Sequence, residues 1–210
     1  DAYNVAVGHA AGENVTTGVD NTIVGGLAGD ALTTGEGSVA IGKSALSATT
    51  VGHDNVAIGK ETLASNVLGS SSIAIGSLAL QDQAPTGTGN TYNIAIGHHA
   101  GKEVTTAVNN TLVGGLAGDA ITSGHSSTAL GYAALSTEDT SSHNTAIGYA
   151  AMASGQNAAK NVAVGNNTLT SMQPASNTDT YNVAVGYNAG LSVTTGTLNT
   201  LVGGLAGDAL

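Results

Sequence analysis

A glycine recurs along the whole chain at a nearly constant spacing, and this spacing constrains the fold more than any other feature. Each of these motif glycines closes a five-residue motif of Asn or Ser, then Val, Ile or Thr, a central apolar residue, Val, Ile or Leu, and Gly. The motif glycines are Gly8, Gly25, Gly42, Gly59, Gly76, Gly97, Gly114, Gly131, Gly148, Gly165, Gly186 and Gly203. A sequence that repeats at a fixed short step predicts repeating units that stack on one another.

The step from one motif glycine to the next is constant, as from Gly25 to Gly42, except that every fifth step is four residues longer, as from Gly76 to Gly97. The longer step creates a second period of 89 residues. We therefore expect a single repeat array over residues 1–210, composed of super-repeats 1–89 and 90–178 and a partial third, 179–210. Because the array starts and stops inside its own pattern, we interpret the chain as a fragment of a longer fibre.

The composition of each repeat predicts strands and turns. Val, Ile and Thr favour strands, and the Asn, Ser and Gly at the motif edges favour turns. Helices are disfavoured because apolar residues alternate and Gly interrupts every repeat. The fold class that we predict is all-β, a parallel β-solenoid (β-roll) of about 17 residues per coil with two short strands in each coil. At a strand spacing of about 4.8 Å, twelve coils give a rod of about 55 Å. The longer steps, at Gln81–Thr91 and Ser171–Thr180, predict surface loops.

The central residue of each motif suggests an interface. Strand alternation places the two residues that flank it on one face and the central residue on the other. If the flanking residues fill the coil, the central residue points outward, where it is apolar in every coil and forms a continuous stripe typical of an interface. We therefore predict an obligate oligomer with its axis along the rod. The predicted interface residues are Ala6, Ile23, Ala40, Ala57, Ala74, Ala95, Leu112, Ala129, Ala146, Ala163, Ala184 and Leu201.

The second half of each coil carries one large apolar residue, placed in one of two ways. The fourth residue after the motif glycine is either Leu or Met, as at Leu46, or Gly, as at Gly29. Where it is Gly, an aliphatic residue follows three positions later, as at Leu32. This compensation predicts a packed interior that each coil fills with one large side chain.

Composition excludes several classes of function. The net charge is −10 and the basic residues are four lysines, so the chain lacks the basic surface that nucleic-acid or anionic-membrane binding requires. No apolar run approaches the roughly 20 residues of a membrane span, so we expect no direct membrane insertion. The absence of Cys excludes a disulfide framework.

One segment partly matches a calcium-binding nonapeptide. Gly25–Leu32 has this pattern, with Asp30 and its equivalents Asp119 and Asp208 as candidate ligands. Calcium sites of this kind need consecutive repeats that share each ion, whereas this segment recurs only once in each super-repeat. We therefore interpret its Gly-Gly pair as making room beside a bulky central residue, which is Ile23 in the first copy.

No other pattern predicts a chemical site. The six histidines have no repeated carboxylate or Ser partner, and Thr pairs such as Thr16-Thr17 skip too many coils for a flat ice-binding array. No Gly-rich stretch continues into the Lys-Ser/Thr of a phosphate loop. A solenoid polysaccharide lyase or glycosidase needs acids or bases clustered on one face, and none breaks the repeat. We predict no catalytic, cofactor-binding or metal-binding residue and no enzymatic activity.

Motifs such as Ser38–Gly42 and Asn144–Gly148 resemble the YadA-like head repeats of trimeric autotransporter adhesins and the β-solenoid repeats of bacteriophage tail fibres. The resemblance covers essentially the whole chain and implies a left-handed β-roll that assembles as a homotrimer. It also implies an extracellular, cell-surface or virion tail-fibre location. We expect an attachment and spacer segment whose partners, besides itself, are a host surface, glycan or extracellular-matrix ligand. The alternative is a purely structural filament or sheath subunit without a specific ligand.

Overall fold

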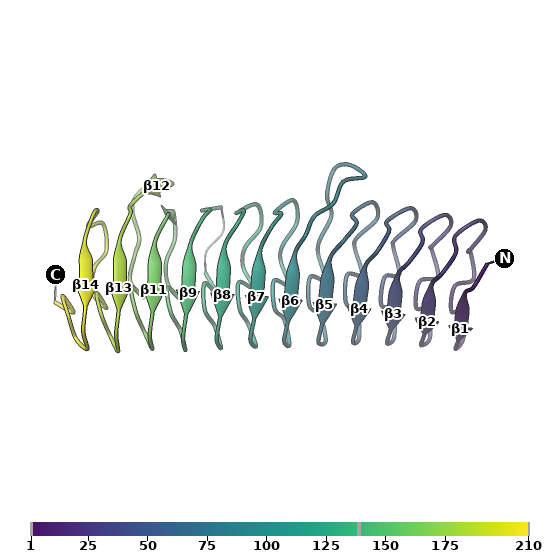
Figure 1. Ribbon diagram of the computed structural model, residues 1–210, viewed down its shortest axis with the longest axis horizontal. Helices are drawn as coiled ribbons and strands as arrows, with labels where there is room; N and C mark the ends of the chain where they lie inside the picture. The colour runs from purple at the N-terminus through teal and green to yellow at the C-terminus, as the bar shows by residue number, and fades with distance from the viewer. Residues whose placement is uncertain (1, 138–139, 210) are drawn as a thin grey trace.

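The computed structural model describes residues 2–137 and 140–209 as a rod of stacked coils (Figure 1). Over these residues the protein is all-β, without a helix, and forms a parallel β-solenoid of about twelve coils spaced by about 17 residues. One strand of each coil covers the three residues before a motif glycine. These strands are β1 Val5–Val7, β2 Thr22–Val24, β3 Val39–Ile41, β4 Val56–Ile58, β5 Ile73–Ile75, β6 Ile94–Ile96, β7 Thr111–Val113, β8 Thr128–Leu130, β9 Thr145–Ile147, β11 Val162–Val164, β13 Val183–Val185 and β14 Thr200–Val202.

These strands form a single parallel sheet in which each strand pairs with its equivalent in the next coil. Val39 pairs with Val56 and Ala40 with Ala57, for example. The register is kept across the longer steps, because Ala74 of β5 pairs with Ala95 of β6. The predicted stacking of equivalent coils is therefore confirmed.

The extra residues of the longer steps leave the rod as two loops. Figure 1 shows the chain between β5 and β6, and the segment around β12, extending from the same side of the rod. In the second loop, β12 (Thr178–Asp179) pairs in parallel with β10 (Ala158–Ala159) of the preceding coil. The position predicted for both loops is confirmed.

The other half of each coil consists of turns, so the prediction of a second strand in every coil is wrong. Residues two and four positions after the motif glycine have positive φ, as at Ser44 (φ 55°) and Leu46 (φ 53°). These bends prevent an extended strand. Neighbouring coils are still joined there by backbone hydrogen bonds: the Leu46 N–H donates to the carbonyl of Thr62 at 3.0 Å.

The predicted orientation of the strands is also wrong: the central residues point into the coil, and the flanking residues point outward. Ten of the twelve predicted interface residues, from Ile23 to Ala184, are at most 1% exposed. The other two, Ala6 and Leu201, lie in the end coils and are covered by one neighbouring coil only. The physical reason is space, because a narrow coil accepts Ala on its inner face but not a pair of Val or Ile residues. Enclosed by their own chain, the ten central residues from Ile23 to Ala184 offer no surface to another copy.

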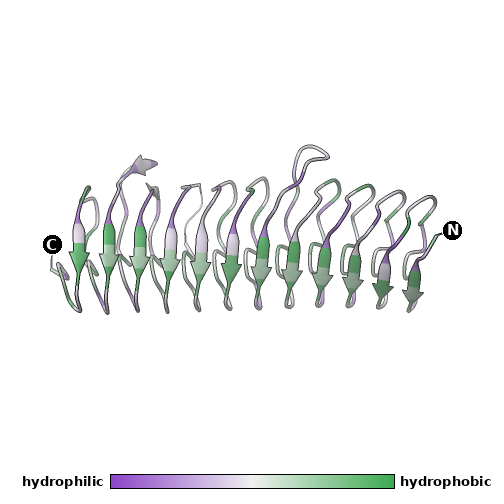
Figure 2. Cartoon of the chain, in the orientation of Figure 1, coloured by the Kyte–Doolittle hydropathy of each residue, from purple (hydrophilic) through white to green (hydrophobic). Residues whose placement is uncertain are grey.

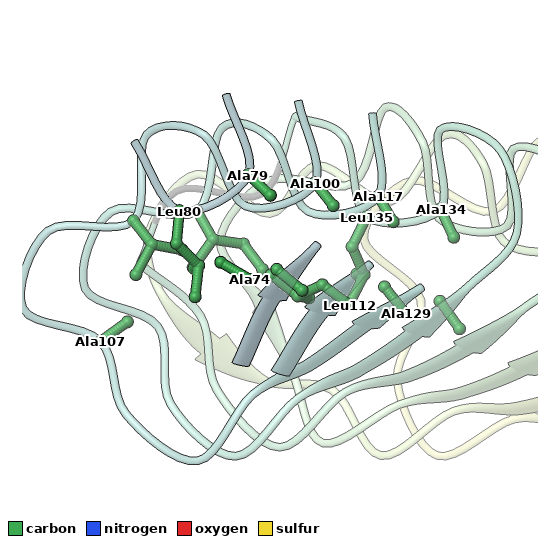
Figure 3. Close-up of a cluster of buried hydrophobic side chains, with 14 of the residues drawn as sticks. Ala74, Ala79, Leu80, Ala100, Ala107, Leu112, Ala117, Ala129, Ala134 and Leu135 are labelled. Atoms are coloured by element: carbon green, nitrogen blue, oxygen red, sulfur yellow. The ribbon is translucent and has the colours of Figure 1, made fainter. Parts of the chain in front are cut away.

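The predicted packed interior is confirmed: most coils bury one large apolar side chain between two columns of alanine, and the coils that contain Ile23, Leu112 and Met172 bury two. Figure 3 shows Leu80 and Leu135 beside Ala74 and Ala129 of the strands and beside a row of alanines in the turns. Where the fourth residue after the motif glycine is Leu or Met, that residue is fully buried. These residues are Leu46, Leu63, Leu80, Leu135, Met152 and Leu169. Where the fourth residue is Gly, the aliphatic residue three positions later fills the coil instead. Of these residues, Val15 is half-buried, Leu210 lies outside the described residues, and the others are buried: Leu32, Val104, Ile121 and Val193.

The bulky central residues explain the position of the glycine coils, by which we mean the coils whose fourth residue after the motif glycine is Gly. A Cβ on Gly101 or Gly118 would lie 2.7 Å from a side-chain carbon of Leu112, and a Cβ on Gly12 would lie 3.0 Å from Ile23. Each bulky residue thus needs glycine four positions after the motif glycine, in its own coil and in the preceding coil. The Gly-Gly pair does not make this room, because a Cβ on Gly26 would contact nothing closer than 4.0 Å.

The Asn or Ser that opens each motif lies inside the coil and forms a buried polar ladder. The Asn110 N–H donates to Asn93 Oδ1 at 3.0 Å, and the Ser127 N–H donates to Asn110 Oδ1 at 2.8 Å. Asn110 Nδ2 also donates to the carbonyl of Gly124 at 2.9 Å, in the segment that leads into the next strand. Within the coils, these side chains therefore replace backbone hydrogen-bond partners where the chain turns into each strand.

The motif glycines are required for two reasons. Their φ values are positive, +141° at Gly131 for example, and a Cβ at Gly131 would lie 2.3 Å from the carbonyl oxygen of Gly148. The backbones of consecutive coils therefore touch at these positions, and no side chain fits between them.

We predict that Gly131→Ala lowers the free energy of unfolding by at least about 2 kcal/mol, because it adds backbone strain to a clash with the backbone of the next coil. Thermal and urea unfolding followed by circular dichroism would measure the change. The matched control is Gly87→Ala in the first loop, where a Cβ meets nothing within 4 Å. We expect this control to stay within about 0.5 kcal/mol of the native chain, and equal losses in the two variants would contradict the prediction.

Candidate interaction surface

The outward face of the large sheet is a strongly apolar surface of the rod, and we call it the outer sheet face. It consists of the first and third residues of each strand, of which nineteen are aliphatic and five are threonine. Figure 2 shows the strands as a row of mostly hydrophobic segments along the rod. Its residues are Val5, Val7, Thr22, Val24, Val39, Ile41, Val56, Ile58, Ile73, Ile75, Ile94, Ile96, Thr111, Val113, Thr128, Leu130, Thr145, Ile147, Val162, Val164, Val183, Val185, Thr200 and Val202.

The outer sheet face is accessible and continuous. Ile96 is 38% exposed and Leu130 is 46% exposed, and most other members are half-buried by the neighbouring strands. Twelve strands spaced by about 4.8 Å, with a width of about 10 Å, give roughly 500 Å². Apolar patches of this size are near the upper end for monomeric proteins and often mark interfaces. The sequence interpretation missed these residues because it assigned them to the interior.

An aromatic corner lies just beyond the motif glycine in the second super-repeat. The rings of Tyr132 and Tyr149 are stacked with their centroids 5.6 Å apart, and both side chains are more than half exposed. A Cβ on Gly115, at the same position of the preceding coil, would lie 3.5 Å from the Tyr132 ring. The Tyr132 ring therefore packs over the backbone of the preceding coil at Gly115, at a distance where a Cβ would make ordinary van der Waals contact.

The first loop is anchored to the buried polar ladder. Asn93 Nδ2 donates to Gln83 Oε1 at 2.9 Å, and the hydroxyls of Ser72 and Thr91 are hydrogen-bonded at 2.5 Å. Between this loop and the next coil is an open pocket of about 230 Å³, lined by Pro85, Thr86, Gly87, Gly89, Asn90, Thr91, Thr106 and Val108. Its lining is uncharged and offers hydroxyl, amide and backbone groups to a ligand.

The second loop is held by an ion pair with an aromatic neighbour. Lys160 Nζ lies 2.6 Å from Asp179 Oδ2 and 5.2 Å from the centroid of the Tyr181 ring. The hydrogen bond to Asp179 raises the pKa of Lys160, and the same bond lowers the pKa of the Asp179 carboxyl. Because both groups are solvent-exposed, the pair positions the loop locally and contributes little to the stability of the fold.

The histidines and Thr pairs have structural surroundings. His53 Nδ1 accepts the Glu36 N–H at 3.2 Å, and His125 Nδ1 accepts the Val108 N–H at 3.2 Å, so both help to join neighbouring coils. The His98 and His99 rings stack with centroids 4.0 Å apart, and the pKa of His99 is lowered by burial, with His98 and Lys102 adding to the effect. In the Thr pairs, hydroxyls such as that of Thr16 donate to carbonyls of the next coil.

The candidate calcium ligands lie apart from one another along the rod. The Oδ1 atoms of Asp30 and Asp119 are buried and have no hydrogen-bond partner. Burial raises the pKa of Asp119, and repulsion from Glu103 adds to the shift. Among residues 2–137 and 140–209, no three or more His, Cys, Asp or Glu side chains are grouped closely enough to hold a metal ion.

The chain was compared with protein-family models, curated proteins and solved structures, and none of the three comparisons finds a match. In the described part of the chain, no helix is long and apolar enough to cross a membrane.

We predict that Asp119→Asn raises the melting temperature at pH 7. The native pKa of Asp119 lies above the unfolded value of about 3.9, so its ionised form destabilises the fold at neutral pH. This effect disappears as the pH falls below the unfolded value, so the difference between variant and native chain should narrow near pH 4. Differential scanning calorimetry at both pH values would measure it.

Asp54→Asn, which changes an exposed carboxylate, is the control and should leave the melting temperature unchanged at both pH values. If calcium raised the melting temperature of the native chain and Asp119→Asn abolished that rise, the prediction would be contradicted and the carboxylate would be a metal ligand.

Proposed function

We propose that this chain is a segment of an extracellular homotrimeric fibre, in a surface adhesin or a phage-type tail fibre, that mediates attachment and acts as a rigid spacer. The observation that carries the proposal is the outer sheet face, an uncharged apolar surface that continues along all twelve strands. A long rod that exposes such a face to water is poorly suited to remain a monomer.

A second and third copy of the same chain fit this face well. Every copy presents the same residues at the same coil spacing, so parallel copies match along the whole rod. None of the 24 face residues is charged, so the net charge of −10 places no like charges between the copies. The number three rests on the resemblance to trimeric adhesin heads and tail-fibre repeats.

Attachment is assigned to the features that interrupt the regular rod. The two loops and the aromatic corner project polar and aromatic groups, and in a trimer each would be present three times. Repeated weak contacts to a host surface, glycan or matrix ligand then combine into strong attachment through avidity. The acidic surface makes a nucleic-acid ligand a poor fit.

A purely structural filament is the second candidate function. It is favoured by the uniform backbone and side-chain ladders, which make a stiff rod without any ligand. A screen of the assembled segment against glycans, matrix proteins and host cells distinguishes the two, because a spacer binds none of them.

We predict that Ile96→Asp combined with Leu130→Asp converts the segment to a monomer, because the carboxylates would lose their hydration in the apolar interface. Light scattering should give three times the chain mass of 20.2 kDa for the native segment and the single mass for the variant. The control is Val67→Asp, an aliphatic residue of similar exposure (41%) in the turns away from the sheet, which should keep the native mass. A monomeric native segment would contradict the proposed assembly.

We also predict that deletion of residues 86–89 reduces attachment but preserves folding and oligomeric mass, since it shortens the longer step to the length of the regular steps. Binding to the ligands found in the screen would be compared with that of Gly87→Ala, which keeps the loop. Unchanged attachment after the deletion would show that the first loop is not a contact site.

A further inference from the structure

Three adjacent threonines interrupt the aliphatic outer sheet face in the second super-repeat. Thr111, Thr128 and Thr145 begin β7, β8 and β9 and pair directly with one another in the sheet. Their equivalents in the first super-repeat are Thr22, Val39 and Val56, so the first super-repeat has one threonine where the second has three. We call Thr111, Thr128 and Thr145 the hydroxyl block.

The hydroxyls of the block are free to meet another molecule. All three residues are half-buried and face outward, and within the described residues their hydroxyls form no hydrogen bond. Several threonines elsewhere do form such bonds, as Thr33 and Thr105 do with carbonyls of the next coil. Threonine has nearly the shape of valine, so the block changes the polarity of the face and leaves its shape almost unchanged.

The polarity of the block matters because the rest of the outer sheet face does little to distinguish one axial alignment of two copies from another. The third residue of every strand is Val, Ile or Leu, so that row alone would allow two copies to slide past each other. A hydroxyl covered by an aliphatic side chain loses its water without gaining a partner, which is unfavourable. A hydroxyl that meets a hydroxyl can both donate and accept.

We infer that the hydroxyl block sets the axial register and the parallel orientation of the copies that associate through the outer sheet face. This inference rests on the proposed assembly. In parallel copies without a shift, each block meets the same block of its neighbours. A shift of one coil places Ile94 and Val162, which flank the block, against threonines. An antiparallel, fully overlapping pair places the block against Ile94, Ile73 and Val56.

The test removes the block and measures the alignment of the copies. The combined variant Thr111→Val, Thr128→Val and Thr145→Val makes the face aliphatic there. Since the chain has no cysteine, Asn166→Cys provides a single spin-label site at an exposed corner. Pulsed electron resonance then measures label-to-label distances within the assembly. The control replaces three exposed threonines of the turns, Thr17, Thr34 and Thr106, by valine.

We expect one narrow distance distribution for the native and control chains. The block variant should keep the oligomeric mass but broaden this distribution toward longer distances, because each coil of shift offsets two labels by about 5 Å along the rod, in quadrature with their lateral separation. Antiparallel copies should add a second population of longer distances. In these copies the two labels lie seven coils apart, which is roughly 34 Å along the rod. A distribution identical to the native one, or a mixed distribution in the native chain, overturns the inference while the proposed assembly stands. Dissociation of the block variant also overturns it, because the block would then hold the copies together rather than align them. A monomeric native chain overturns both the inference and the proposed assembly.

Discussion

The buried ladder of Asn and Ser side chains is the interaction on which the rest of the structure depends. In each coil the backbone must turn sharply into a strand of only three residues, and the N–H at that turn has no strand partner. Asn93 and Asn110 supply the missing acceptor to the next coil, and Asn110 also donates to the carbonyl of Gly124. Because the side chain is fully buried, an unpaired amide there would be strongly unfavourable. A polar side chain at one position of each coil therefore ties that coil to the next and sets the phase of its strand.

Once the ladder sets the phase, the faces of the strand follow. Asn110 and Leu112 are two residues apart and must share the inner face, which leaves Thr111 and Val113 outside. The inner face then has to fit a coil so narrow that Ala is its usual occupant. Leu112 is accepted only because Gly101 and Gly118 leave space for its side chain. The same inner width explains why a coil with a bulky central residue carries glycine at the position where other coils carry Leu or Met.

Repeat length, stacking, loop positions and the compensated interior could be predicted because each leaves a periodic mark in the sequence. The orientation of the strands could not be read from hydrophobicity. Both faces of each strand are apolar, so the alternation of residues does not show which face points to solvent. Two signals were available nonetheless. The Asn that opens the motif is two residues from the central residue, and the glycine coils occur in pairs at the bulky central residues Ile23, Leu112 and Leu201. Both signals place the central residue inside. The positive φ of Leu46 was signalled only by the coils that carry glycine at the same position, such as Gly29, because leucine itself is not a typical turn residue.

The inverted orientation strengthens the case for association and changes where functional differences can arise. An outer row of alanines would bury little area against another copy, whereas a row of Val and Ile buries much more for the same length. A rod with a constant cross-section, however, presents the same surface at every coil and cannot by itself recognise one position or one partner. Recognition must come from the coils that depart from the repeat. Those departures are the two loops, the Tyr132 and Tyr149 corner, and the hydroxyl block, and they occur on different sides of the coil. In the assembly that we propose, the loops and the tyrosines would stay exposed to a ligand, while the block would lie on the face that a second copy covers.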